Sequence, residues 1–206
     1  MEYIKKPMRI EERSFEIIEE EIGNKLDDFT EQQIPIVKRV VHTTADFEYA
    51  QLIEFSPNAV EKAKSSLLGG KSIYCDTSMI MAGINKRKIS KLGVNLINYV
   101  HDDDVRKKAE KKGTSRSMEG IEKAAIDSNI GIFAVGNAPT ALFKLKELIE
   151  KGLKPDLIIG VPVGFVGAEE SKEILKKMNI PYITIRGRKG GSTVAAAVVN
   201  AILKMI

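Results

Sequence analysis

The sequence has few of the residues from which many functional sites are built. Of its 206 residues, one is cysteine, two are histidine and none is tryptophan. The single Cys75 excludes an internal disulfide and a zinc site made of cysteines, and it fits a reducing compartment. No apolar run approaches the roughly 18 residues of a membrane span, and the first residues lack the apolar core of a secretory signal. The sequence therefore predicts a cytoplasmic protein with no metal site and no membrane span.

Several common ligand motifs are absent as well. No GxGxxG fingerprint occurs, the segment GRKGGST lacks the spacing of a phosphate-binding P-loop, and there is no G-x-S-x-G nucleophile elbow. The formal net charge of +4 favours an anionic partner without specifying its kind. The basic residues are dispersed and no aromatic RNA-binding motif is present, so a nucleic-acid partner is not expected.

What the chain does contain is a regular alternation of apolar runs and amphipathic segments. Strands are predicted at 34–41, 72–76, 94–100, 131–135, 156–163 and 182–188, and helices at 10–23, 47–55, 57–68, 105–112, 116–125, 141–150, 171–178 and 194–206. Strands that alternate with helices of this length are typical of parallel sheets covered on both faces. The charged stretch KRKISK (86–91) is interpreted as a short break, too short to separate two domains. We therefore expect one doubly wound α/β domain over residues 1–206, with a mainly parallel sheet.

Ligands of open α/β sheets bind beyond the carboxyl ends of the strands, and this rule selects the candidate site. The polar residues that follow the predicted strands include His42, Asp76, Ser78, Asn137, Arg186 and Arg188. Several of the loops that hold them are rich in glycine, which either permits close approach of a ligand or simply serves a tight turn. If the sheet forms as predicted, these side chains gather on one edge.

His42 has two interpretations. As a residue at the end of a buried strand it hydrogen-bonds to the backbone, whereas as a functional residue it is a general acid or base, because histidine titrates near neutral pH. Arg39 lies inside an apolar run that is predicted to be a strand, where a charge needs a partner or a cavity. Arg39, Arg116 and the pair Arg186 and Arg188 are candidate carboxylate binders, because the guanidinium fork matches a carboxylate.

Eight motifs converge on a known family. They read ERSFEII (12–18), RVVH (39–42), FSPNAV (55–60), DTSMIMAGIN (76–85), RSM (116–118), GNAPTALF (136–143), GVPVGFVGAEESK (160–172) and RGRKGGS (186–192). Over nearly its whole length the chain resembles the precorrin-8X methylmutases, also called cobalt-precorrin-8 methylmutases. GNAPTALF and GVPVGFVGAEESK are the most specific pair.

The resemblance implies a flavodoxin-like three-layer α/β/α sandwich and a homodimer with its sites near the subunit interface. It implies an isomerase, an intramolecular transferase of cobalamin biosynthesis, that moves a ring methyl group from C-11 to C-12. Precorrin-8 then becomes hydrogenobyrinate, or cobalt-precorrin-8 becomes cobyrinate. The family's catalytic histidine falls on His42, as proton donor, and two of its substrate contacts fall on Ser14 and Arg39. No cofactor is expected, because an isomerisation needs no redox partner.

Two alternatives remain open at this stage. The first is a carrier protein that binds a corrinoid without changing it, against which His42 in its full RVVH setting argues. The second is a flavodoxin-like enzyme acting on a phosphorylated small molecule, against which the missing phosphate motifs argue. The sequence leaves open whether the substrate carries cobalt.

Overall fold

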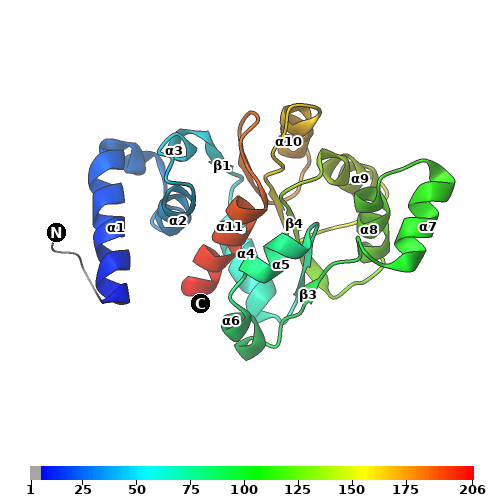
Figure 1. Ribbon diagram of the computed structural model, residues 1–206, viewed down its shortest axis with the longest axis horizontal. Coiled ribbons are helices and arrows are strands. Elements are labelled where there is room, and N and C mark those ends of the chain that lie inside the picture. The colour runs from blue at the N-terminus through cyan, green and yellow to red at the C-terminus, as the bar shows by residue number, and fades with distance from the viewer. Residues whose placement is uncertain (1–5) are drawn as a thin grey trace.

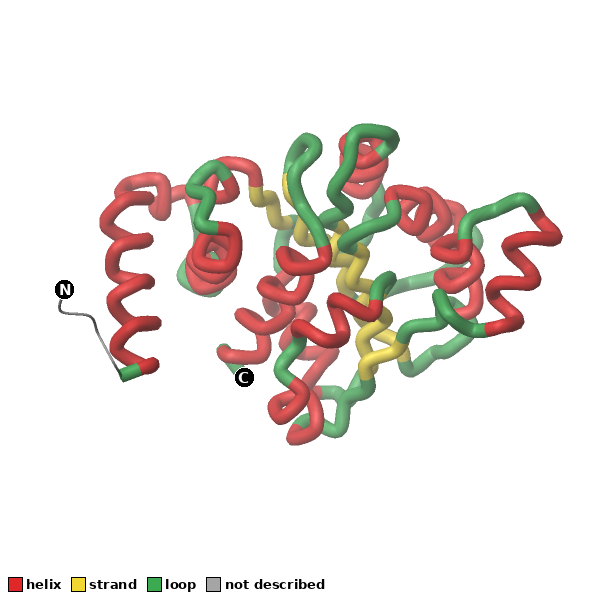
Figure 2. Tube along the Cα trace, in the orientation of Figure 1, coloured by secondary structure: helices red, strands yellow, loops and turns green. Residues whose placement is uncertain are grey.

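The centre of the molecule is a six-stranded sheet, seen in a computed structural model that describes residues 6–206. The strands lie in the order β1-β6-β5-β4-β2-β3. Their bounds are β1 (Ile53–Phe55), β2 (Ser72–Cys75), β3 (Leu96–Ile97), β4 (Ile130–Val135), β5 (Leu157–Gly160) and β6 (Tyr182–Ile185). All neighbours pair in parallel except β1, which runs antiparallel to β6 at the sheet edge. The predicted α/β fold with a mainly parallel sheet is confirmed, and Figure 2 shows the strands enclosed by helices.

Helices cover both faces of this sheet. They are α1 (Pro7–Ile22), a 3-10 helix η1 (Gly23–Asp28), α2 (Ile34–Thr44), α3 (Tyr49–Leu52), α4 (Ala59–Leu68), α5 (Ser78–Gly83), α6 (Lys86–Lys91), α7 (Asp103–Lys112), α8 (Arg116–Ala124), α9 (Pro139–Glu150), α10 (Ala168–Lys176) and α11 (Ser192–Lys204). Helices α2, α4, α5 and α11 share one core with the sheet, and α8, α9 and α10 share the other. At the two ends, α1 lies outside α2 and α7 outside α8 (Figure 1). No helix among residues 6–206 is both long enough and apolar enough to cross a bilayer.

The predicted strand at 34–41 is wrong, because this segment forms the first part of helix α2. Its content of β-branched residues favours a strand, but the buried residues Ile36, Val37, Val40 and Val41 follow the period of a helix. Pro35 lies in the first turn, where a helix tolerates proline because the missing N–H would have no intrahelical partner. His42 therefore lies in the last turn of a helix and not at the carboxyl end of a strand.

Other predicted segments differ in extent or type. The strand expected at 182–188 ends at Ile185. The helix expected at 47–55 is helical only at Tyr49–Leu52, and its last residues form the edge strand β1, in which Ile53 pairs with Ile185. The strands expected at 94–100 and 156–163 are shorter, at Leu96–Ile97 and Leu157–Gly160. The charged stretch 86–91 is not a break but helix α6, whose first turn is capped by the Asn85 side chain accepting from the Lys88 N–H at 3.1 Å.

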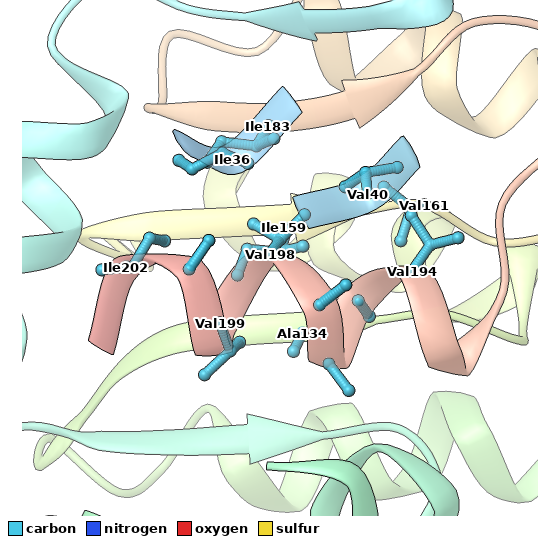
Figure 3. Packing of buried hydrophobic residues seen from close by; sticks show 14 of the residues in the cluster. Ile36, Val40, Ala134, Ile159, Val161, Ile183, Val194, Val198, Val199 and Ile202 are labelled. Atoms are coloured by element: carbon cyan, nitrogen blue, oxygen red, sulfur yellow. The ribbon is translucent and has the colours of Figure 1, made fainter. Parts of the chain in front are cut away.

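Helix α11 is the centre of the larger core. Nine of its thirteen residues are buried, and a helix that is apolar on nearly every side needs neighbours on every side. Figure 3 shows Val194, Val198 and Ile202 of α11 beside Ile36 and Val40 of α2 and the strand residues Ile159 and Ile183. The packing of α2 on α11 therefore fixes the position of the helix that carries Arg39 and His42.

Removal of the Ile36 side chain tests this packing. The side chain is fully buried, so Ile36→Ala is expected to lower the free energy of unfolding by about 2–5 kcal/mol. Leu68→Ala at the end of α4 is the matched control, because Leu68 is 64% exposed, and its effect is expected to stay within about 0.5 kcal/mol. Urea denaturation followed by circular dichroism measures both values. Equal effects of the two substitutions would contradict the buried α2–α11 contact.

Candidate active site

Helices α1 and α2 bring the candidates His42 and Arg39 together with the Phe15 ring. The rings of His42 and Phe15 are stacked, with centroids 5.1 Å apart and planes inclined by 21°. The Arg39 guanidinium lies over the same Phe15 ring, 4.6 Å from its centroid. His42 and Arg39 are three residues apart on α2, a spacing that puts them on one helix face. Phe15 thus gives both polar side chains a common apolar support.

The charges of this cluster are paired in part. Arg39 donates to the carboxylate of Glu11 on α1, and the Lys204 ammonium lies 3.3 Å from the same carboxylate. The hydrogen bond from Arg39, with a smaller contribution from Lys204, lowers the pKa of the Glu11 carboxyl despite partial burial. Ser14 donates its hydroxyl hydrogen to the Ile10 carbonyl at 2.7 Å, so its side chain is bonded within α1. Arg39, which was expected inside a strand, has its ionic partner on a neighbouring helix.

A second group lies at the carboxyl ends of the strands and is organised by Asp76. Its carboxylate accepts hydrogen bonds from the N–H groups of Gly136, Asn137 and Ala138, each at 2.9 Å. Asp76 is only 2% exposed, and this burial raises its pKa while the three backbone donors oppose the rise. Asp76 therefore shapes the loop between β4 and α9 and leaves the exposed Asn137 at the surface.

Two contacts join this loop to its neighbours. Thr77 and Ser192 share a hydrogen bond of 2.9 Å between their hydroxyls, which connects the segment after β2 with the start of α11. Ser115 and Thr140 do the same at 2.9 Å, which connects the start of α8 with the start of α9. Ser115 also caps α8, and the next residue, Arg116, is exposed. The predicted site residues Ser78 and Arg116 therefore lie at helix starts held against neighbouring loops.

The loop at 186–191 carries the two remaining arginines. Arg186 donates to the Gln51 carbonyl at 3.2 Å and lies 3.8 Å from the Glu54 carboxylate. The Arg188 guanidinium lies 5.7 Å from the ring centroid of Phe165, which is 85% exposed on the loop after β5. Both arginines are exposed at the surface.

Lys189 connects this loop to the α1–α2 cluster. Its ammonium group binds the carboxylates of Asp46 and Glu48, in the turn that follows α2 and His42. Its carbonyl oxygen accepts a hydrogen bond of 2.8 Å from the ammonium of Lys172, a side chain on α10 that is 1% exposed. Burial lowers the pKa of Lys172 to about 8, and Glu169 opposes this only in part.

The structure thus arranges the predicted site residues in two groups. Ser14, Arg39 and His42 lie on α1 and α2, and Asp76, Ser78, Arg116, Asn137, Arg186 and Arg188 lie on the loops and helix starts beyond the strands. Glu11, Phe15, Lys172 and Lys204 were not predicted as site residues, whereas Lys189 lies among the polar residues that follow the last predicted strand. Phe15 and Lys172 lie within quoted motifs, where proximity to Ser14 and to the glycine-rich loop was an available signal. Lys204 had no such signal, because it contacts Glu11 and Phe15 from the other end of the chain.

Fold and site together define a doubly wound α/β protein in which an exposed histidine stacks on a phenylalanine ring that also contacts an arginine. The sequence profile of the family described as "Precorrin-8X methylmutase" matches residues 9–205. The chain belongs to the precorrin-8X methylmutase family. Its place there makes it an isomerase of cobalamin biosynthesis.

Individual relatives resemble the chain over almost its full length. The cobalt-precorrin-8 methylmutase of Priestia megaterium is 47% identical over 197 residues, covering 95% of this chain and 87% of the relative. The protein of the same name from Salmonella typhimurium is 42% identical, covering 98% of this chain and 97% of the relative. The crystal structure of a precorrin-8X methyl mutase from Thermus thermophilus has a TM-score of 0.86 at 35% identity, covering 95% of this chain and 96% of that chain.

Buried Lys172 predicts a pH dependence of stability. Its folded pKa of about 8 lies below the roughly 10.4 of an unfolded lysine, so between these values the unfolded chain binds more protons and stability rises with pH. The unfolding free energy of wild type minus that of Lys172→Met should therefore increase by up to about 1.4 kcal/mol per pH unit above pH 8.

The control for this measurement is Lys177→Met, which removes an exposed lysine from the residue just after α10. Burial raises the pKa values of Tyr74 and Cys75, which lowers stability at alkaline pH, but both groups are present in all three proteins and cancel in the difference. Urea denaturation at pH 7.5, 8.5 and 9.5 provides the comparison. A difference that does not change with pH would show that Lys172 is charged throughout.

Proposed function

We propose that this protein moves a methyl group from C-11 to C-12 of precorrin-8X or cobalt-precorrin-8, with His42 as proton donor, giving hydrogenobyrinate or cobyrinate. The observation that carries this proposal is the stacking of an exposed His42 on Phe15 beside Arg39. An acid–base group is then held next to a carboxylate-binding group, as a carboxylated macrocycle requires. Membership of the methylmutase family supplies the reaction class.

The chemistry is an internal rearrangement. The methyl carbon breaks its bond to C-11 and forms one to C-12, so the substrate and product have the same formula. The proton that His42 donates to the macrocycle must therefore return to the enzyme. A positioned proton donor contributes roughly 10²- to 10⁴-fold to the rate. We assign the rest to a bound geometry that resembles the migrating state more closely than the substrate.

The second group of residues suits the rim of this ligand. Precorrin-8X is a large, mostly flat ring fringed with acetate and propionate groups, so it needs donors around an apolar slot. Arg116, Arg186 and Arg188 provide exposed guanidinium groups, and Ser78 and Asn137 provide uncharged donors nearby in the fold. Asp76 does not contact the ligand in this proposal but holds the backbone of the loop that carries Asn137.

We further propose that the chain forms a single methylmutase domain, works as a homodimer and resides in the cytoplasm. In support of a dimer, α1 exposes three large apolar side chains, Met8 at 76%, Ile10 at 46% and Ile17 at 38%, on a helix at the end of the molecule (Figure 1). In support of a reducing compartment, the single cysteine is a free thiol buried in the core.

Replacement of His42 tests the proton donor. His42→Ala is expected to lower kcat by about 10²- to 10⁴-fold, because the donor is lost, and to leave the Kd for the product within about twofold. The fold should survive, since the His42 side chain is exposed and contacts Phe15 by stacking at the surface. His101→Ala removes the other histidine, also exposed, and serves as control. Unchanged turnover in His42→Ala would rule out the general-acid role.

Replacement of Arg39 tests the substrate contact. Arg39→Ala is expected to raise the Kd for the carboxylated product about tenfold or more, because its guanidinium lines a hollow between α1, α2 and α11 and its side chain is only 19% exposed. Arg13→Ala, on the neighbouring helix and about half exposed, is the matched control. Titration of the product's absorbance measures binding. Equal dissociation constants for Arg39→Ala and wild type would exclude Arg39 from the binding site.

A further inference from the structure

A cavity of about 330 Å³ lies between α1, α2 and α11, beside the His42 cluster. Its apolar walls come from Phe15, Ile34, Pro35, Ala201 and Met205. At roughly 30 Å³ per water molecule, it has room for about ten waters. It can therefore accept a side arm of a larger ligand while leaving the body of that ligand outside.

Three cationic side chains line the same cavity. They are Lys38, Arg39 and Lys204, and each lies within 5.7 Å of the Phe15 ring centroid. Two carboxylates offset them, since Glu19 pairs with Lys38 while Glu11 is shared between Arg39 and Lys204. One positive charge is therefore left over, at a site whose walls are mainly apolar.

We propose that this cavity is a carboxylate subsite that takes one acetate or propionate arm of the corrinoid, with Lys38 and Lys204 joining Arg39 as its binding groups. The inference rests on the proposed function and names the part of the ligand that the cavity receives. An arm of this kind is a short alkyl chain that ends in a carboxylate, so it matches both the apolar walls and the excess positive charge. Its insertion anchors the macrocycle beside His42.

Glu11 has a particular part in this subsite. Its carboxylate occupies the position between Arg39 and Lys204 that an incoming carboxylate would take. Interaction with these two cations lowers the pKa of Glu11, so the residue is ionised when the ligand arrives. Glu11 therefore competes with the ligand carboxylate for the same donors and keeps the cations paired when no ligand is bound.

The test measures the Kd of hydrogenobyrinate, the proposed product, by absorbance titration at low and at moderate salt. Lys38→Met and Lys204→Met are each expected to raise the Kd, by up to about fivefold for a partly exposed charge. Both should also flatten the dependence of Kd on salt, because fewer charges are screened. Glu11→Gln is expected to lower the Kd about threefold, since it frees Arg39 and Lys204. Lys62→Met, an exposed lysine on α4, should leave binding unchanged.

Unchanged affinity and unchanged salt dependence in the lysine variants would overturn the subsite. So would sedimentation showing that these variants weaken binding by dissociating a dimer, because the cavity would then belong to a second copy of the chain. The Tm of Glu11→Gln shows whether this substitution loosens α1. If the Tm falls, only the Kd values of Lys38→Met and Lys204→Met are used to judge the subsite. Wild-type protein that binds product but does not convert substrate would contradict the proposed function alone, whereas normal turnover with unaffected variants would contradict the subsite alone.

Discussion

The position of the loop at 186–191 between the two groups of site residues depends on the contacts of one residue, Lys189. Its ammonium binds Asp46 and Glu48 after α2, and its carbonyl is held by the buried ammonium of Lys172 on α10. The loop at 186–191 is thereby fixed from both sides of the sheet. The Lys172 contact has a cost, because burying an ammonium with a single acceptor disfavours its charged form. In return, the Lys172 contact helps to fix the loop that carries Arg186 and Arg188.

Close packing of backbone on backbone explains the glycines of these loops better than contact with a ligand does. A Cβ on Gly136 would come within 2.8 Å of the Ser192 Cα, and one on Gly190 would come within 2.2 Å of the Val161 carbonyl oxygen. Gly190 also has a φ of +150°, a region that side chains rarely adopt. At these two positions glycine is therefore required by the close packing of one loop on another, and not by the approach of a ligand.

The sequence predicted the sheet and its loops more accurately than the part of the site on α1 and α2. The strands at 72–76 and 131–135 are confirmed, and the one at 182–188 is confirmed as far as Ile185, because short apolar runs that end in polar or glycine residues favour a buried strand followed by a turn. The segment 34–41 was misassigned because strand propensity and helical periodicity compete there, and tertiary packing on α11 decides. Arg39 and His42 were still found, since their motif does not depend on secondary structure. Glu11 and Lys204 were not, because the contact between them joins the two ends of the chain.

The central claim is that a corrinoid binds at the α1–α2 cluster and rearranges there. An anaerobic absorbance time course tests it most directly, with precorrin-8 and cobalt-precorrin-8 supplied separately, because methyl migration changes the conjugation of the ring. The account predicts that at least one form shifts to the spectrum of its product, and the form that does so identifies whether the substrate carries cobalt. Tight binding of both forms with an unchanging spectrum would contradict it and would favour a corrinoid carrier.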